Sequence, residues 1–565
     1  MLWKIIGVLA IINLIFQVEA TEPIVETVYG KIRGNILNGV NNDTFFAFQG
    51  IPFAKPPLGK LRLQPPQRPD SWEGILDDRN AYKQCIPMNL IVTPNQTEDC
   101  LYLNVYTRQL PSKDQNVSLP VVVYIHGGAF VFGSAQIESY GPHFLIERDV
   151  ILVTIQYRLG FFGFLSTGDL VCPGNNGFKD QQFAIRWVQE NIHSFGGDPK
   201  RVTIFGQSAG AASVGYQLLG SNSTGLFRAA IQDSGSSLGS WTLQSNPRKF
   251  AYEFGNHINH NINETNTTSE ELIEYFRTLD ISTIVNAYAD IFGVGMIGGF
   301  YKTLSGKLFA GVIEPEHDGA FLTESAFNRF QSGNFNVVPL LIGVNTEEAL
   351  FLAFDSKLHE RMIIYDKYPE LIVPPDFHLS DVNITRPIGE DIRKIYVGSG
   401  RFQDNLGPSI EYFSDSAFCR PSIKQAELES HYTNVYFYEF AYSGKKSQFP
   451  LPNIPGAGKV FHGAELTYIL SRKDTTDLSK WDKEDLVTLK RMVTLWTNFI
   501  KYLNPTPEPS ELLQNITWPS LSPTSDMTYL LINDTLQVKY NLKKPMVDEY
   551  NRLYDTYAIP PLVTY

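Results

Sequence analysis

The hydrophobic residues of this chain fall into short, nearly continuous runs separated by polar stretches and by segments with helical spacing. The runs are rich in β-branched and aromatic residues and are too short for typical helices, so we predict that they form buried strands. They cover 101–106, 120–125, 150–157, 202–205, 337–344 and 434–442, and a hairpin-like pair follows at 529–532 and 536–540. Apolar residues at helical spacing predict helices over 180–191 and 485–502.

This alternation of strands and helices favours an α/β fold, in which a mostly parallel central sheet is covered by helices on both faces. No linker or charge block divides the chain, so we expect residues 21–565 to form a single domain. From Trp241 to Gly333 the pattern is helical and irregular. Gly293–Gly298 formally fits a dinucleotide-binding G-x-G-x-x-G motif, but no convincing strand precedes it, so we reject that function.

Composition and charge narrow the class of protein further. The 565 residues are 43% hydrophobic, 19% charged and 13% aromatic, which is ample material for a core and argues against disorder. The net charge is −12. An acidic surface repels phosphate backbones, so we expect no nucleic-acid partner.

The first 20 residues have the pattern of a secretory signal peptide. Lys4 precedes an apolar run from Ile5 to Phe16, and Val18-Glu19-Ala20 supplies the small residues that signal peptidase prefers. The alternative is a membrane anchor, but the run is too short to span a bilayer core. We therefore expect cleavage after Ala20, secretion and no membrane span.

Secretion predicts glycosylation and disulfide bonds. The N-x-S/T sequons are at Asn42, Asn95, Asn116, Asn222, Asn263, Asn266, Asn383, Asn515 and Asn533. Cys85 and Cys100 bracket a short polar loop, as a local disulfide would in an oxidising compartment. Cys172 and Cys419 could pair across the fold or remain free, and we favour free buried thiols.

Ser208 stands at the centre of Gly-Gln-Ser-Ala-Gly, between the apolar run 202–205 and a stretch of small residues that can open a helix. Strand, sharp turn and helix form the context of a nucleophile elbow. A serine hydroxyl needs a base, and His462 is our candidate. The acid that orients the imidazole should come from Glu347 or Glu348, which follow the run 337–344, but position alone does not choose between them.

The sequence also contains a candidate oxyanion hole. His126-Gly127-Gly128-Ala129 follows the run 120–125 and matches an HGG loop, whose backbone N–H groups face the developing negative charge. The order serine, acid, histidine along the chain is that of the α/β-hydrolases. We expect no metal and no cofactor to be needed for this chemistry.

Together these features resemble the type-B carboxylesterase and cholinesterase family over nearly the whole chain after residue 20. Its markers are Glu98–Val105, Tyr157–Gly163, Pro173–Gln181, Phe195–Pro199 and the elbow around Ser208. The resemblance implies an α/β-hydrolase fold with large helical insertions over the active site, and a serine esterase that works through an acyl-enzyme on small-molecule esters.

The resemblance also assigns individual residues. It selects Glu348 rather than Glu347 as the catalytic acid, because a small residue, Ala349, follows it. It implies oxyanion donors at Gly128, Ala129 and Ala209, a serine that supports the acid at Ser234, and an acyl-pocket wall at Trp241. It further implies structural ion pairs between Arg62 and Glu98 and between Arg158 and Asp180.

The resemblance does not extend to acetylcholine as a substrate. The loop between Cys85 and Cys100 carries no tryptophan, and the residue before Ser208 is Gln207 rather than the glutamate of cholinesterases. The elbow is similar to that of insect esterases, including juvenile hormone esterases. The alternative function is a non-catalytic adhesion or sequestering relative on the same fold, but such relatives usually lose the serine and carry a membrane span.

Overall fold

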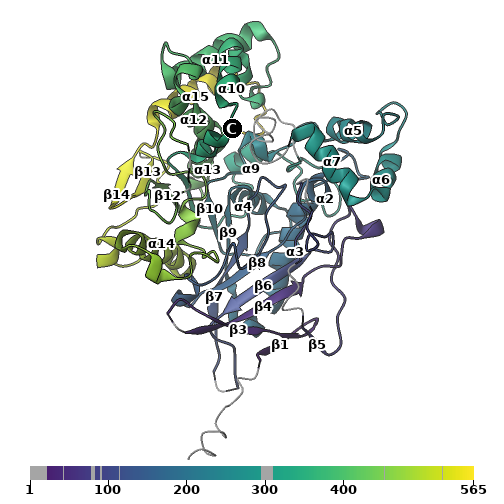
Figure 1. Cartoon of the computed structure of the whole chain (residues 1–565), viewed down its shortest axis with the longest axis vertical. Coiled ribbons are helices and arrows are strands. Elements are labelled where there is room, and N and C mark those ends of the chain that lie inside the picture. Colours follow the sequence, from purple (N-terminus) through teal and green to yellow (C-terminus); the bar gives the residue numbers. More distant parts are fainter. Residues whose placement is uncertain are drawn as a thin grey trace, which may run out of the picture.

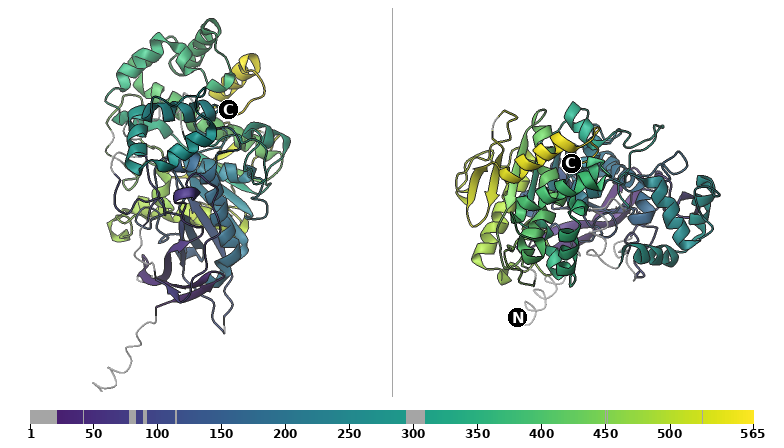
Figure 2. Two further views of the ribbon diagram at one scale, coloured as in Figure 1. Left: turned by 90° about the vertical axis from the view of Figure 1, so that its right-hand side faces the viewer. Right: turned by 90° about the horizontal axis from the view of Figure 1, so that it is seen from above.

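The computed structural model describes residues 22–41, 43–77, 83–88, 92–113, 115–293, 309–448, 450, 452–524 and 526–565. In this part of the chain an 11-stranded sheet forms the centre of the molecule, with helices on both sides (Figures 1 and 2). Its strand order is β14-β13-β12-β11-β10-β9-β7-β8-β6-β4-β3. The bounds are β3 Asn35–Asn38, β4 Thr44–Pro52, β6 Tyr102–Thr107, β7 Leu119–Ile125, β8 Ile151–Ile155, β9 Gly197–Gln207, β10 Ala229–Asp233, β11 Leu340–Asn345, β12 Val435–Phe440, β13 Thr528–Ile532 and β14 Leu536–Tyr540.

The middle of this sheet is parallel, from β8 through β7, β9, β10, β11 and β12 to β13. The strands at both ends, β3, β4 and β6 on one side and β14 on the other, pair antiparallel. The expected mostly parallel sheet is therefore confirmed, and each predicted strand is present with bounds shifted by a few residues. Strand β10 was not predicted, because its residues Ala-Ala-Ile-Gln-Asp include only one β-branched side chain.

The sheet is buried on both faces, as parallel sheets require. Along β7, Val121, Val123 and Ile125 belong to one hydrophobic cluster, whereas Val122 and Tyr124 belong to another. The first cluster includes residues of α3 (Asn176–Asn191) and α4 (Ala209–Leu219). The second includes residues of α14 (Lys483–Tyr502). The alternation of side chains in β7 thus fixes which helices pack on which face.

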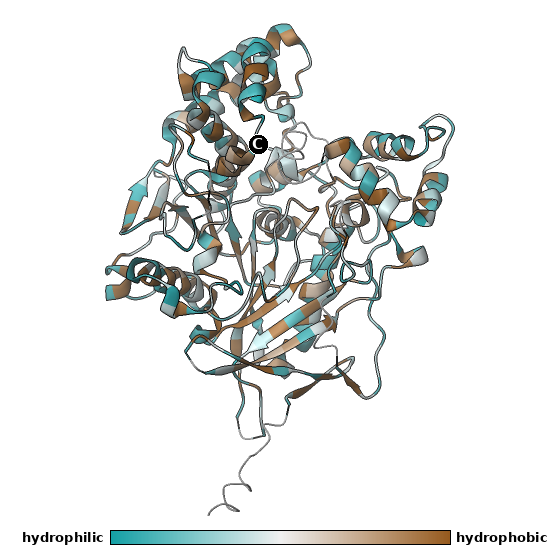
Figure 3. Cartoon of the chain, viewed as in Figure 1, coloured by the Kyte–Doolittle hydropathy of each residue, from teal (hydrophilic) through white to brown (hydrophobic). Residues whose placement is uncertain are grey.

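A second, small sheet has the order β1-β2-β5, with bounds Ile24–Thr27, Gly30–Arg33 and Ile75–Leu76. At the opposite end of the molecule, two groups of helices lie over the large sheet (Figure 1). The first group is α5 Pro247–Ile258, α6 Ser269–Thr278 and α7 Ile281–Phe292, and the second is α10 Leu358–Lys367, α11 Val382–Val397, α12 Leu406–Ser414, α13 Arg420–Ser430 and α15 Lys544–Tyr557. A further helix, α9 Ala326–Ser332, packs against α13 and α4. Along these helices hydrophilic and hydrophobic residues alternate (Figure 3), as expected for helices that bury one side.

Three sequence predictions fall wholly or partly outside the described residues. The signal peptide over residues 1–20 and the sequon at Asn42 are outside them. So is the G-x-G-x-x-G segment after Gly293, which follows directly on α7. None of the helices formed by the described residues has the length and apolar content needed to cross a lipid bilayer.

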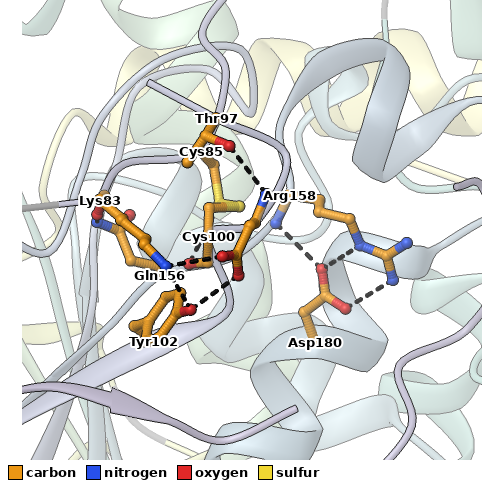
Figure 4. The surroundings of a disulfide bond; sticks show 9 residues. Lys83, Cys85, Thr97, Cys100, Tyr102, Gln156, Arg158 and Asp180 are labelled. Atoms are coloured by element: carbon orange, nitrogen blue, oxygen red, sulfur yellow. Dashed lines mark hydrogen bonds and ion pairs between the residues drawn. A yellow bond between two sulfur atoms is a disulfide. The ribbon is translucent and has the colours of Figure 1, made fainter. Parts of the chain in front are cut away.

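The disulfide between Cys85 and Cys100 forms as predicted and lies beside a group of polar contacts (Figure 4). Lys83 Nζ donates to Asp99 Oδ2 over 2.7 Å, and the Tyr102 hydroxyl donates to Asp99 Oδ1 over 2.8 Å. These contacts fix the loop that the disulfide closes. Cys172 and Cys419 are free and buried, which confirms the favoured alternative for the other two cysteines.

Two ion pairs anchor the segments around this loop. Arg158 and Asp180 form a bidentate pair, with Nε to Oδ2 and Nη2 to Oδ1 both at 2.7 Å, and both side chains are buried (Figure 4). Arg62 Nε and Nη2 donate to Glu98 over 2.8 and 2.5 Å. Both expected pairs are present, and the first joins the loop after β8 to α3.

Candidate active site

Ser208 lies in a sharp turn between β9 and α4. Its backbone has φ 60° and ψ −124°, a region that residues other than glycine rarely occupy. The turn requires its flanking glycines: a Cβ on Gly206 would lie 2.1 Å from the Gly210 carbonyl oxygen, and one on Gly210 would lie 2.0 Å from that of Ile125. The local geometry is therefore that of a strained elbow, which directs the serine side chain out of the strand–helix packing.

The structure brings Glu348 and His462 into direct contact, although 113 residues separate them along the chain. His462 Nδ1 lies 2.6 Å from Glu348 Oε2, and the Asn345 backbone N–H donates to Glu348 Oε1 over 2.6 Å. Glu348 is fully buried, and it opens the first turn after β11. A carboxylate only accepts hydrogen bonds, so Nδ1 is the donor, and the neutral ring then carries its lone pair on Nε2.

The neighbouring carboxylate, Glu347, points elsewhere. The Thr346 hydroxyl donates to its Oε2 over 2.7 Å, and a Cβ on Gly458 would lie 2.1 Å from its Oε1. Of the two adjacent acids, Glu348 is thus the one that contacts the imidazole.

The relation between Ser208 and His462 is less direct. Among the described residues, Nε2 of His462 makes its hydrogen-bond contact with the amide Nε2 of Gln207, at 3.1 Å, rather than with the Ser208 hydroxyl. Because Gln207 immediately precedes Ser208, the elbow and the imidazole are nevertheless adjacent. Ser208 is buried, with 9% of the residue exposed.

The HGG loop lies against the elbow. A Cβ on Gly127 would be 2.7 Å from the Gln207 carbonyl oxygen and 3.0 Å from Ser208 Cβ. The backbone then has φ of 111° at Gly128 and 52° at Ala129, so the loop turns sharply beside Ser208. Ala209 is the first residue of α4, and the first amides of a helix have no intrahelical partner. The HGG loop and the first residue of α4 therefore both lie beside Ser208.

Aromatic side chains form a wall beside the imidazole. The centroid of the Phe418 ring lies 4.5 Å from the centroid of the His462 ring and 5.8 Å from that of the Trp241 ring. Trp241 is buried, and its Nε1 donates to the Ala417 carbonyl oxygen over 2.7 Å. The acyl-pocket role of Trp241 stays a prediction. Phe418 was not predicted, because it belongs to a π-helical turn, Asp415–Cys419, which no hydrophobic pattern indicates.

Two further buried acids, Glu465 and Asp233, were also missed. Glu465 contacts Asn345, whose Nδ2 donates to its Oε2. Burial, with the negative charge of Glu348, raises the pKa of Glu465 to about 7. Burial, with the negative charge of Glu465, raises the pKa of Asp233 well above its usual range. The environment thus opposes the ionisation of both acids, which limits the negative charge beside Glu348.

Ser234 is fully buried near this acidic group, with φ of 58°. Its hydroxyl has no hydrogen-bond partner among the described residues. Its predicted support of Glu348 therefore stays a prediction.

His126, in the HGG loop, is not a competing base. Its ring is buried and stacks on that of Tyr157 with centroids 4.5 Å apart. Burial lowers the pKa of His126 to about 4, so the ring is neutral in ordinary buffers. Its Nδ1 lies 2.8 Å from the Gly127 carbonyl oxygen, which ties the ring to the loop.

Comparison with known proteins identifies the class. The fold matches the crystal structure of juvenile hormone esterase from Manduca sexta, solved with OTFP covalently attached, with a TM-score of 0.81, 26% identity and coverage of 94% of this chain and 100% of the other. The chain therefore has the α/β-hydrolase fold, as expected, and it is a carboxylic ester hydrolase.

The family follows from sequence. The model of the carboxylesterase family matches residues 21–550, and the chain belongs to that family. It is 32% identical to pyrethroid hydrolase Ces2e of Rattus norvegicus over 515 residues, covering 87% of this chain and 84% of the relative. It is also 32% identical to juvenile hormone esterase of Tribolium castaneum over 533 residues, covering 89% and 86%.

Proposed function

We propose that this esterase hydrolyses small carboxylic esters through an acyl-enzyme on Ser208, with His462 as general base and Glu348 as the orienting acid. The observation that carries the proposal is the 2.6 Å contact between Glu348 and His462 beside the strained turn that holds Ser208. An acid, an imidazole and an elbow serine in this arrangement are the parts of a hydrolytic triad.

In the acylation step, Nε2 of His462 takes the proton of the Ser208 hydroxyl as Oγ forms a bond to the ester carbonyl carbon. The π electrons of the carbonyl move to its oxygen. The electron pair on that oxygen then re-forms the carbonyl as the bond between carbon and the alkoxy oxygen breaks. The imidazolium gives its proton to the alkoxy oxygen, and the alcohol leaves the acyl-enzyme. Glu348 stabilises the positive ring throughout because it accepts from Nδ1–H.

The oxyanion formed in this step needs hydrogen-bond donors. The backbone amides of Gly128, Ala129 and Ala209 are our candidates, because the loop and the helix start converge on Ser208. In similar sites the loss of one donor costs about 3 kcal/mol of transition-state stabilisation. In deacylation, water takes the place of the alcohol. His462 takes a proton from the water as the water oxygen bonds to the acyl carbon. The imidazolium then returns the proton to Ser208 Oγ as the bond between Oγ and the acyl carbon breaks.

The acyl group should lie against the wall formed by Trp241 and Phe418, next to the imidazole. This wall is apolar, and Gln207 adds no charge beside it. We therefore infer that the preferred esters are neutral and apolar, and that choline esters are poor substrates.

The labelling of Ser208 by an organophosphate tests the proposal. Diethyl p-nitrophenyl phosphate should abolish turnover of p-nitrophenyl acetate and add one diethylphosphoryl group per chain, since a phosphoryl centre traps an activated serine. Peptide mass spectrometry should place the group on the peptide that contains Ser208. Labelling at another residue, or full activity after stoichiometric labelling of Ser208, would refute the proposal.

We also propose that the enzyme is secreted and glycosylated. The leader in residues 1–20, the Cys85–Cys100 disulfide and the positions of the sequons support this. Asn95, Asn116, Asn222, Asn263, Asn266, Asn383 and Asn515 are exposed, and Asn533 is half-exposed. The protein recovered from the medium of secreting cells should begin at Thr21, and its mass should fall on treatment with a peptide N-glycosidase. Retention of the intact leader within the cell would contradict this part of the proposal.

A further inference from the structure

The side chain of Gln207, the last residue of β9, has no part in the steps described above. It is 6% exposed, and its Nε2 lies 3.1 Å from Nε2 of His462. A Cβ on Gly127 would be 3.1 Å from its Oε1, and a Cβ on Gly463 would be 3.5 Å from its Nε2. The amide is thus held between the HGG loop and the loop that carries the imidazole.

The two contacts of the imidazole are compatible with one protonation state. Glu348 accepts a hydrogen bond, so Nδ1 must carry a proton. The Gln207 amide N–H is a donor, so Nε2 must offer its lone pair. The neutral tautomer with hydrogen on Nδ1 satisfies both partners, and it is the tautomer that a general base needs in order to take the proton of Ser208.

We propose that Gln207 is a positioning residue, whose side-chain amide holds His462 in its base-competent neutral tautomer without adding charge to the site. The inference rests on the proposed triad. Glu348 selects the tautomer from the Nδ1 side, and Gln207 selects the same tautomer from the Nε2 side. The Ser208 hydroxyl displaces or shares this contact when the reaction starts.

The charges around the ring explain why a neutral amide suits this position. The titratable groups that face it or its acid partner are Glu348 on the turn after β11, Glu465 after the histidine loop, Asp233 at the end of β10, Tyr438 on β12 and Cys419 in the π-helical turn. Burial favours the neutral forms of Tyr438 and Cys419, so the charged neighbours can only be acids. A carboxylate at position 207 would add another negative charge and favour the imidazolium.

The decisive variant is Gln207→Glu, which keeps the size of the side chain and replaces the donor by an acceptor. A carboxylate near Nε2 stabilises the doubly protonated ring, which cannot act as a base, so protonated enzyme persists to higher pH. The acid limb of the kcat/KM profile for p-nitrophenyl acetate should move up by about 1 to 2 pH units. Activity at pH 9, on the alkaline side of the shifted limb, should be about tenfold below that of the parent, because a carboxylate donates to Nε2 no more than a leucine does.

Two further variants separate this role from a structural one. Gln207→Leu removes the donor without adding charge, so kcat should fall about tenfold while KM and the acid limb stay close to those of the parent. Gln182→Glu on α3 makes the same charge change at a half-buried glutamine whose amide donates to the Ser223 hydroxyl, far from the imidazole in sequence and contacts. Its pH profile should coincide with that of the parent.

The outcomes are distinct. A shifted acid limb in Gln207→Glu together with a lowered kcat in Gln207→Leu supports the inference. An unshifted limb in the first variant, or an unchanged kcat in the second, overturns it. Failure of the triad itself would show differently, because Ser208→Ala would then keep its activity whatever the residue at position 207.

Discussion

Replacing Ser208 with alanine should lower kcat for p-nitrophenyl acetate by about 100,000-fold, a loss of the size seen when a triad nucleophile is removed. The fold should survive, because alanine fits the backbone of the turn no worse than serine and the hydroxyl is not needed to pack it. What remains is the activity that the oxyanion donors and binding alone provide. Initial rates with purified protein, freed of contaminating esterases by affinity purification, give the measurement.

Ser213→Ala is a matched control for this variant. Ser213 lies in α4, one turn beyond the elbow, and its hydroxyl donates to the Ala209 carbonyl oxygen over 2.8 Å. The same hydroxyl accepts from Gln181 Nε2, so removing it costs two hydrogen bonds but no nucleophile, and kcat should stay within about threefold of the parent. Equal losses in the two variants would mean that disturbance of α4, and not loss of the nucleophile, explains the effect of Ser208→Ala.

The Glu348→Gln variant should lose about 10,000-fold in kcat. A glutamine amide can turn an N–H toward Nδ1, and the imidazole would then carry its proton on Nε2, where it cannot accept the proton of Ser208. The variant would also lose the negative charge that stabilises the imidazolium. KM should change little, because the 2.6 Å contact is with His462 and not with substrate.

Glu347→Gln is the paired control, one residue away along the chain. Glu347 is half-buried and bonds to Thr346 rather than to the imidazole. Its replacement should leave kcat within about threefold of the parent. If Glu347→Gln instead lost activity and Glu348→Gln kept it, Glu347 would be the carboxylate that contacts His462. That result would contradict the proposed role of Glu348.

Much of the fold could be read from local sequence pattern. The strands of the sheet centre are continuous apolar runs because both of their faces are buried, and this signal survives without any knowledge of partners. The exception is β10, whose two alanines and single isoleucine are too small to stand out. The strand is evident only in the structure, where it pairs with β9 and β11 and places Asp233 beside Gln207 and Gly343.

The site was only partly accessible to the same reasoning. The glycines around Ser208 are visible in sequence because the turn has no room for a Cβ, and the structure gives the clashing atoms. The choice between Glu347 and Glu348 came from family resemblance, since both follow β11 and only three-dimensional contacts distinguish them.

Other neighbours of the imidazole depended on tertiary structure entirely. Phe418 reaches the ring through a π-helical turn, and Glu465 lies close to Glu348 through its contact with Asn345. Gln207 was noticed as an uncharged residue before the serine, but its contact with His462 could not be inferred, because the two are 255 residues apart. Side chains that meet across loops leave no periodic signal in sequence.

The most direct test of the triad is whether its members act as one unit. We would measure kcat for Ser208→Ala, for His462→Ala and for the double variant under identical conditions. If the serine depends on the imidazole for its activation, the second replacement removes nothing further, and the double variant should be as active as the worse single variant within about threefold. If the two losses instead multiply in the double variant, the residues act independently and the proposed mechanism is wrong.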